Sequence, residues 1–223
     1  TMSNPTLVNG AIKVKNNMSG IGKMETQVSG FEVATKYDVS CYAISTAEVV
    51  YGDVVNFITP IDVQGIVLNE EGEAIANANI VFSNSNTSLT SQTNQNGEFS
   101  IKGVFDSESY KIVVKAKGYA DYTMSRSFSL TNKSITIFMQ KLGSISGIIK
   151  DDAGFVLINH PVVCGGKLKT YTDNNGYYEF QDLIPGQYYI SAELDGYFRS
   201  GSSDYVQVLS GRNSICNFTL EKN

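Results

Sequence analysis

The sequence predicts an all-β protein made of antiparallel β-sandwiches arranged in tandem. Short segments of alternating apolar and polar residues are separated by turn residues about every ten positions, which is typical of sandwich strands. No segment combines the 3.6-residue apolar period of a helix with capping residues at its ends. The composition agrees, because 13 Tyr, 11 Phe and 20 Gly in 223 residues favour strands and tight turns. This length allows two or three small domains.

One order of strands and turns occurs twice, first from residue 63 and again from residue 145. The first copy opens with V-Q-G-I-V at 63–67, and an acidic turn that contains glycine follows at 69–72. The second opens with I-S-G-I-I at 145–149 and has its acidic turn at 151–154. Both copies end in an alternating strand, which runs through Ile135, Ile137 and Met139 in the first and Ile215, Phe218 and Leu220 in the second. The shared order predicts two copies of one module.

The clearest stretch of the module runs from 172 to 197 and predicts strand, turn and strand. The turn T-D-N-N-G needs a glycine at 176 that can adopt positive φ. The next strand alternates so that Tyr178 and Phe180 point to one side. The first copy repeats this with T-N-Q-N-G at 93–97, followed by Phe99 and Ile101. The long central strands then predict the following buried residues: Tyr110, Ile112 and Val114, and Tyr188, Ile190, Ala192 and Leu194.

The predicted domains are 61–141 and 142–223, each a complete sandwich. The joints are short, because residues 59–62 lead into the first of these domains and residues 141–144 join it to the second. We therefore expect a stiff, elongated array. Residues 1–60 leave two alternatives open. They form a degenerate or partial third sandwich, because 8–12 resembles the opening strand and 26–31 resembles the turn, or they form a partial sheet that completes or caps its neighbour. In either case Tyr37, Val39, Cys41 and Ala43 form the apolar face of a strand.

Four motifs carry a family resemblance over residues 61–222. They are the openings V-Q-G-I-V and I-S-G-I-I, the turns T-N-Q-N-G-E-F and T-D-N-N-G-Y-Y, the segment L-I-P-G-Q-Y, and the G-Y pair after each central strand. In these motifs the chain resembles tandem carboxypeptidase regulatory-like domains, whose fold is a prealbumin-like (transthyretin-like), Ig-like β-sandwich. The resemblance implies a secreted or surface setting in bacteria and an accessory, non-catalytic role. The first copy departs from the pattern at 104–109, where a Pro-Gly turn is usual.

The sequence offers no arrangement typical of catalysis, and we predict no catalytic, cofactor-binding or metal-binding residue. His160 is the single histidine, and its position beside Pro161 predicts an exposed turn. The three cysteines include no C-x-x-C pair, and Cys41 and Cys216 fall at apolar-face positions, which predicts buried free thiols.

Two other chemistries have candidate residues. The segments Asp151-Asp152 and Asp173-Asn174-Asn175-Gly176 offer oxygen ligands for calcium, but turn formation explains them without a metal. An intramolecular isopeptide bond, as in Cna-type B repeats of bacterial adhesins, would need Lys150, Asn217 and Glu193 to meet in the core. Strand alternation places Glu193 on the outer face, which argues against this bond.

Charge and hydropathy restrict the partners. The net charge is −5 with a pI of about 4.9 and no basic run, which makes nucleic acid an improbable partner. No apolar stretch approaches the ~20 residues of a transmembrane helix. We therefore expect a non-enzymatic, extracytoplasmic array (extracellular, cell-surface or periplasmic) that serves as a structural spacer or adhesion module. Its partner would be a protein or glycan at the cell surface. The alternatives are a glycan-binding module and the accessory region of a larger peptidase.

Three tyrosines form the candidate interaction surface: Tyr171, Tyr177 and Tyr189. By alternation they point away from the core, and the matching positions of the first copy are polar where the two can be aligned, with Glu98 for Tyr177 and Lys111 for Tyr189. Tyrosine suits stacking on sugars or on protein partners. The alternative is that cross-strand aromatic pairs simply stabilise an exposed sheet.

Overall fold

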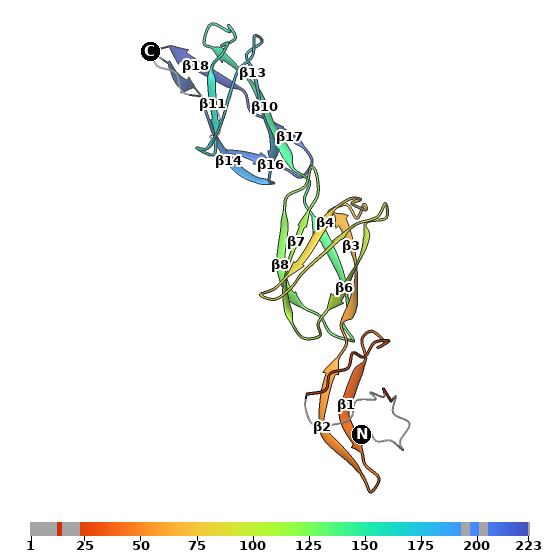
Figure 1. Ribbon diagram of the computed structural model, residues 1–223. Coiled ribbons are helices and arrows are strands. Elements are labelled where there is room, and N and C mark those ends of the chain that lie inside the picture. Colours follow the sequence, from red (N-terminus) through yellow and green to blue (C-terminus); the bar gives the residue numbers. More distant parts are fainter. Residues whose placement is uncertain (1–12, 15–22, 193–196, 201–204, 223) are drawn as a thin grey trace.

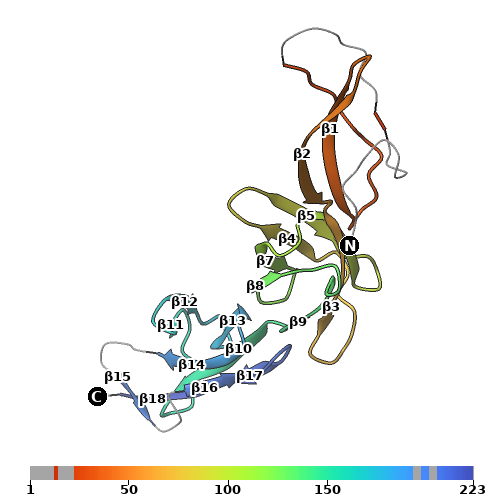
Figure 2. The same ribbon diagram turned by 90° about the horizontal axis from the view of Figure 1, so that it is seen from below.

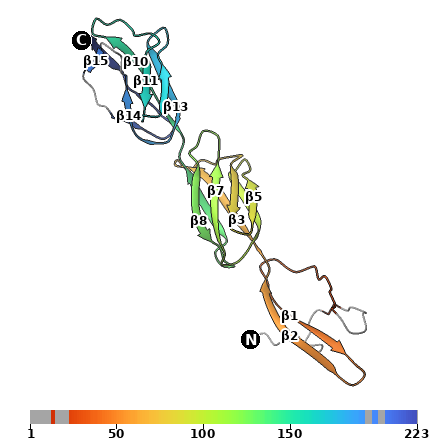
Figure 3. The same cartoon turned by 60° about the vertical axis from the view of Figure 1, so that its left-hand side comes forward.

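The computed structural model describes residues 13–14, 23–192, 197–200 and 205–222, and all regular secondary structure in these residues is β-strand. The predicted all-β class is therefore confirmed. The strands form three successive parts along an elongated chain, with a two-stranded ribbon at one end and two sandwiches beyond it (Figures 1 and 3). No helix in the described residues is long and apolar enough to span a membrane.

The ribbon consists of β1 (Lys36–Ile44) and β2 (Val49–Ile58), which pair antiparallel. A bulge lies where the register shifts between Ser40 and Tyr42. The joint between the ribbon and the middle sandwich is short, because only Thr59 and Pro60 separate β2 from the next strand. The Thr59 hydroxyl accepts a hydrogen bond from the Thr35 N–H at 2.8 Å and donates one to the Glu32 carbonyl at 2.6 Å. The predicted opening strand at 8–12 lies outside the described residues.

The middle sandwich comprises two sheets of strand order β6-β3-β9 and β5-β4-β7-β8. Its strands are β3 (Ile61–Asn69), β4 (Asn79–Ser83), β5 (Ser88–Gln92), β6 (Glu98–Val104), β7 (Ser109–Lys115), β8 (Tyr122–Ser127) and β9 (Ser134–Met139). The opening strand β3 runs antiparallel to β6 and parallel to β9. The two sheets enclose one apolar core, in which Tyr110, Ile112 and Val114 are fully buried, as predicted.

The C-terminal sandwich has the sheet orders β13-β10-β18-β15, with β17 also paired to β10, and β12-β11-β14-β16. Its strands are β10 (Gly143–Asp151), β11 (Pro161–Cys164), β12 (Leu168–Tyr171), β13 (Tyr177–Leu183), β14 (Gly186–Ser191), β15 (Tyr197–Ser200), β16 (Tyr205–Val208), β17 (Asn213–Ile215) and β18 (Phe218–Lys222). Ile190 and Ala192 are buried in its core, whereas Tyr188 is only half-buried. The core position predicted for Leu194 lies outside the described residues.

Each opening strand contains a glycine that lies under an aromatic ring of the neighbouring strand. Gly65 pairs with Phe99, and Gly147 pairs with Tyr178. A Cβ added at Gly65 would come within 2.2 Å of the Phe99 ring, and one at Gly147 within 2.8 Å of the Tyr178 ring. The glycine of V-Q-G-I-V and I-S-G-I-I therefore creates the space that the core aromatic fills.

The turns before these aromatics follow the predicted geometry. Gly97 and Gly176 have φ of 74° and 70°. A buried threonine precedes each turn and joins two backbone segments through its hydroxyl. Thr93 accepts from the Ala78 N–H and donates to the Ile75 carbonyl, at 2.8 and 2.7 Å. Thr172 makes the same pair of bonds with His160 and Leu157.

Three expectations about single side chains are wrong. His160 is 2% exposed, because it occupies the position that the buried Ala78 has in the middle sandwich. Cys41 is exposed, because none of the described strands forms a second layer over the face of the ribbon on which it lies. Ile215 is 73% exposed, because Cys216, Phe218 and Leu220 alternate onto the buried face and Ile215 lies on the other face. Cys216 is buried, as expected.

Candidate functional site

The joint between the two sandwiches is three residues long, and each residue in it is held by hydrogen bonds. Gln140 donates from its side chain to Glu70 at 3.1 Å and accepts from the Ala120 N–H at 2.9 Å. The N–H of Leu142 donates to the Gly118 carbonyl at 2.9 Å. All three hydrogen bonds are made with the middle sandwich, so the chain leaves β9 along a fixed path.

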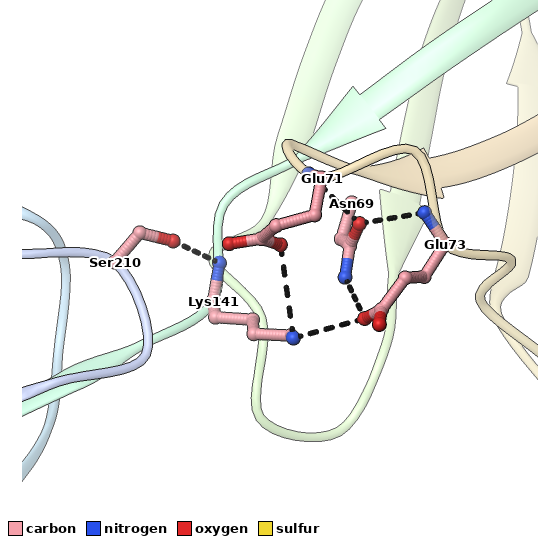
Figure 4. Close-up of polar contacts among 5 residues, drawn as sticks. All are labelled: Asn69, Glu71, Glu73, Lys141 and Ser210. Atoms are coloured by element: carbon pink, nitrogen blue, oxygen red, sulfur yellow. Dashed lines mark hydrogen bonds and ion pairs between the residues drawn. The ribbon is translucent and has the colours of Figure 1, made fainter.

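Lys141 contacts both sandwiches (Figure 4). Its backbone N–H donates to the Ser210 hydroxyl of the C-terminal sandwich at 3.1 Å. Its side chain reaches the other way, and its Nζ lies 3.3 Å from a carboxylate oxygen of Glu73 and 3.7 Å from one of Glu71. We call Asn69, Glu71, Glu73, Lys141 and Ser210 the junction cluster.

Asn69 organises the acidic turn of this cluster. It is almost completely buried, and its side-chain oxygen accepts from the N–H groups of Glu71 and Glu73 at 3.0 and 2.8 Å. Its side-chain amide donates to the Glu73 carboxylate at 2.6 Å. The acidic turn that the sequence showed therefore has a second role, because it directs two carboxylates at the lysine of the joint (Figure 4).

The charges of the junction are mutually stabilised. Hydrogen bonding from Asn69, and then from Lys141, lowers the pKa of the Glu73 carboxyl. Hydrogen bonding to Glu73 raises the pKa of Lys141. Ser210 and Gln140 lower the pKa of Glu70 in the same way. The contacts are present above the ordinary glutamate pKa and are lost as the pH falls through the lowered values. Because the groups are solvent-exposed, their main effect is on geometry rather than on stability.

Close backbone packing completes the junction from the C-terminal side. The N–H of Gly211 donates to the Lys141 carbonyl at 3.3 Å. A Cβ at Gly211, whose φ is 64°, would lie 3.1 Å from the Lys141 side chain. A Cβ at Gly143 would lie 2.6 Å from the Leu209 carbonyl oxygen. The turn before β17 therefore lies directly against the joint, and only glycine fits at both positions.

The structure places the three candidate tyrosines on two different sheets. Tyr171 and Tyr189 lie on β12 and β14 of one sheet, and β11 separates them. Tyr177 lies on β13 of the other sheet, opposite Ile148. All three are exposed, by 52%, 43% and 39% for Tyr171, Tyr189 and Tyr177. The fold therefore does not bring the three together on one face.

Each tyrosine has a different local neighbour. The ring of Tyr189 packs edge-on against Tyr205 with centroids 5.6 Å apart. The Lys169 ammonium lies 5.0 Å from the ring centre of Tyr171, a cation–π contact. The candidate surface therefore divides into three separate aromatic sites, two on one sheet and one on the other. Each of these sites has to be tested by itself.

The middle sandwich has an open polar trough of about 850 Å³ over the sheet β6-β3-β9. Its lining includes Gln64, Ser91, Gln92, Ser100, Arg126 and Thr136. Arg126 donates to the Asn132 side chain at 2.8 Å and lies over the Phe128 ring, and it forms no ion pair with any described residue. The trough thus offers amides, hydroxyls, one cation and the carboxylate of Glu98, which together suit a hydroxyl-rich ligand.

The residues that could carry catalysis or bind a metal have structural roles. Burial lowers the pKa of His160, and contact with the Ala192 backbone only partly offsets this effect. Neither imidazole nitrogen forms a hydrogen bond of normal geometry. Burial raises the pKa of the Cys164 thiol to about 11. Within the described ranges, no three His, Cys, Asp or Glu side chains gather as metal ligands.

The residues weighed for calcium and for an isopeptide bond are also accounted for. Asp173 accepts from the N–H groups of Asn175 and Tyr177, so its carboxylate closes the turn. Asn217 accepts from the Ile148 N–H at 2.8 Å. Lys150 and Asn217 are both exposed rather than enclosed in the core, and Glu193 lies outside the described residues.

Sequence reasoning found the joint but not the junction cluster. The two signals that were present are the acidic turn E-E-G-E at 70–73 and the lysine at 141. They lie far apart along the chain, and only the parallel pairing of β3 with β9 brings the end of one strand beside the end of the other.

The fold and its motifs define a class of protein for the middle sandwich. Residues 62–137 match the carboxypeptidase regulatory-like domain, which confirms the resemblance for this part of the chain. The match does not extend to 142–223, where the resemblance stays a prediction. A search of curated proteins finds no match.

Several solved structures are similar to the chain. The minor pilin GBS52 of Streptococcus agalactiae is 12% identical, with 73% of this chain and 96% of that one covered and a TM-score of 0.40. The TIE protein of Bacillus anthracis is 15% identical, with 84% and 41% covered and a TM-score of 0.36. The keratinolytic enzyme fervidolysin of Fervidobacterium pennivorans is 13% identical, with 61% and 25% covered and a TM-score of 0.34. The chain thus spans less than half of the TIE protein.

Proposed function

We propose that the chain is a non-catalytic, extracytoplasmic array of β-sandwich modules that acts as a stiff structural spacer, with 61–141 and 142–223 as two copies of one module. It would hold an interaction or adhesion surface at a defined distance within a bacterial surface or secreted protein. The observation that carries this proposal is the three-residue joint, in which every residue is hydrogen-bonded. The regulatory-like match of the middle sandwich supports the accessory role.

The junction cluster supplies the stiffness. A joint of three residues already limits the range of angles between the two sandwiches. The hydrogen bonds of Gln140, Lys141 and Leu142 select one angle within this range. The ion pairs of Lys141 contribute little free energy at an exposed site. Their contribution is geometric, because they fix the lysine between the acidic turn of one sandwich and the Ser210 turn of the other.

Distance distributions between two spin labels test this function. One label is attached at Thr123→Cys in the middle sandwich and the other at Lys150→Cys in the C-terminal sandwich, in a Cys41→Ser background. The distance between the two labels reports how one sandwich is placed relative to the other. We expect a narrow distribution for the otherwise unaltered chain and a broader one for Lys141→Ala. The matched control is Lys115→Ala, which removes an ion pair with Asp121 within one sandwich and should leave the distribution narrow. A broad distribution before any change at Lys141 would contradict the spacer function.

Glycan binding is the second candidate function, and the polar trough is the observation that favours it. Amide and hydroxyl side chains across its floor can exchange hydrogen bonds with sugar hydroxyls, and Arg126 can contact an acidic sugar. A glycan array should then show binding that is lost in a Gln64→Ala/Arg126→Ala variant. A triple variant, Tyr171→Ala/Tyr177→Ala/Tyr189→Ala, tests the three tyrosines independently of the trough. Equal binding by all three proteins, or by none, would exclude both surfaces.

A further inference from the structure

Arg126 has an unusual position for a charged side chain, because strand alternation turns it toward the interior of the middle sandwich. It lies on β8 opposite the fully buried Tyr110 of β7, and the next inward residue along the chain is the buried Phe128. Its guanidinium lies 5.2 Å from the centre of the Phe128 ring and donates to the Asn132 side chain at 2.8 Å. That hydrogen bond uses one of the five N–H donors of the guanidinium, and no carboxylate of a described residue pairs with it.

The arginine reaches the polar trough because β8 is an edge strand. β8 and β9 are edge strands of the two sheets, and the turn at 128–133 joins them (Figure 2). An inward side chain on such a strand can leave the core at the seam between the sheets and extend along the neighbouring sheet. Arg126 thereby lines the trough over β6-β3-β9, and it is the single cation among the described residues that do so.

The C-terminal sandwich shows that the strand order does not require this arginine. Arg126 pairs with Tyr110, and the residue that pairs with the equivalent Tyr188 of β14 is Val206 of β16. Val206 packs against the apolar core, as expected for an inward residue. The module therefore folds with an apolar side chain at this position, and a charge there serves something other than the fold.

The floor of the trough differs between the two sandwiches in the same way. Gln64 is exposed in the middle sandwich, where it precedes the glycine of the opening strand. At the same position the C-terminal sandwich has Ser146, which is only 5% exposed because the Asn213 amide donates to its hydroxyl at 2.7 Å. The exposed polar floor and the arginine thus occur together in the middle sandwich, and both are replaced at these positions of the C-terminal one.

The trough carries opposite charges on its two sides. Glu98 lies on β6, where its carboxylate accepts from the Asn94 amide at 3.0 Å. Because β3 and β9 lie between Glu98 and Arg126, the two charges are at least two strand spacings apart, about 10 Å, which is roughly the length of a disaccharide. The floor between them is neutral and includes the side chains of Gln64 and Thr136.

We propose that the trough binds an acidic glycan whose carboxylates are separated by neutral sugar units, and that Arg126 selects the carboxylate. The inference rests on the glycan-binding function proposed above and names its ligand class. A guanidinium can hold a carboxylate through two parallel charge-assisted hydrogen bonds. The hydroxyls of the next sugar unit then face the neutral floor. Glu98 repels a second carboxylate, so a glycan with an acid on every unit binds less tightly.

A glycan array with paired compounds tests this ligand class on the full chain. Alternating oligosaccharides of a uronic acid and an N-acetylhexosamine are each printed beside the same compound with its carboxyl groups reduced to alcohols. Oligogalacturonate supplies the glycan with an acid on every unit. The chain should bind the alternating acids about tenfold or more tightly than their reduced forms, because a hydrogen-bonded charge pair is lost on reduction. It should also bind them more tightly than oligogalacturonate.

Variants assign the selectivity to Arg126. Arg126→Gln should remove the preference for the acidic forms, and Arg126→Lys should keep only part of it, because an ammonium lacks the planar fork of a guanidinium. The matched control is Lys111→Gln, which removes the same charge from the outer face of the other sheet and should bind like the unaltered chain. Glu98→Gln should increase binding of oligogalacturonate several-fold, a gain that loss of folding cannot produce.

The outcomes separate this inference from the functions proposed above. Equal binding of acidic and reduced forms would overturn the inference and leave glycan binding in place, whereas no binding to any compound would overturn both. An inward charge on an edge strand also discourages pairing with another chain. If Arg126→Gln aggregated while its soluble fraction kept the acid preference, that protective role would replace the proposed one. The spin-label distances test the spacer function independently of all these results.

Discussion

The two sandwiches fill the same central position with different aromatics. In the middle sandwich, Phe99 covers Gly65, and β9 continues without a break beside β3. In the C-terminal sandwich, Tyr178 covers Gly147, and its hydroxyl donates a hydrogen bond to the Cys216 carbonyl at 2.6 Å. The carbonyl of Cys216 lies in a break between β17 and β18, across which the register with β10 does not change.

This difference shows how one strand order adapts to a polar group at its centre. A tyrosine hydroxyl in the core needs a partner, and the Cys216 carbonyl, in the break between β17 and β18, provides it. A similar difference occurs at Ala78 and His160, where the threonine hydroxyl makes the same bonds to either backbone. The strand order is shared apart from β15, which the C-terminal sandwich adds beside β18, and the side chains differ where the local backbone adjusts to them.

The largest expected effect comes from placing alanine at the two covered glycines. A Cβ at Gly147 would lie 1.8 Å from the Cys216 carbonyl oxygen, so backbone must move. At Gly65 the contacts are with side chains of Phe99 and Ile135, which can shift. We expect Gly147→Ala to lower the free energy of unfolding by about 4 kcal/mol or more and Gly65→Ala by about 1–3 kcal/mol. Urea denaturation measures both, and equal losses would contradict the difference between the backbone contact at Gly147 and the side-chain contacts at Gly65.

Two equivalent core isoleucines test whether the sandwiches fold separately. Ile112 and Ile190 are both fully buried on central strands. Their replacement by alanine should each cost about 2–5 kcal/mol through lost burial and a cavity. Hydrogen exchange followed by mass spectrometry should show the loss in one sandwich only, the one that carries the change. If either variant weakened both sandwiches equally, the domains 61–141 and 142–223 would not be independent.

The hydroxyl of Tyr178 should have a smaller effect. Tyr178→Phe copies the middle sandwich and leaves the buried Cys216 carbonyl without this donor, which should cost about 1–2 kcal/mol. The reciprocal control, Phe99→Tyr, adds a hydroxyl to a core in which the last strand, β9, has no break to receive it. We expect that variant to be destabilised as well. A stabilised Phe99→Tyr would show that the break in the last strand is not what accommodates the hydroxyl.

The smallest effect concerns the pH dependence of the C-terminal sandwich. Burial lowers the pKa of His160 below its usual 6.5, so the unfolded chain binds this proton more readily than the folded one. Stability should therefore fall as the pH drops below about 6.5, until the folded pKa is reached. For His160→Ala, which introduces the residue that the middle sandwich has at Ala78, the free energy of unfolding should change less with pH in this window. Unfolding curves recorded at several pH values measure this dependence. If the free energy of unfolding depended on pH in the same way in both proteins, His160 would not be the titrating group.

The sequence by itself determined the parts of the fold that depend on short-range pattern. Alternation identified the buried faces of β7 and of much of β14, and turn chemistry placed Gly97 and Gly176 at positive φ. These features are readable because side chains alternate along any strand and because few residues tolerate a left-handed turn. The aromatic and glycine that meet across β3 and β6 were also visible as separate motifs, but not as a contact.

Only the tertiary structure decided which surfaces meet. Alternation showed that Tyr171, Tyr177 and Tyr189 point outward but could not show that they lie on two sheets, because that depends on strand order. His160 was misjudged because its burial depends on the layer that covers the turn. The junction cluster unites residues 69–73, 141 and 210 through the parallel pairing of β3 and β9 and the packing of a distant turn. Local pattern specifies the direction of each side chain, and only the three-dimensional path of the chain specifies its neighbour.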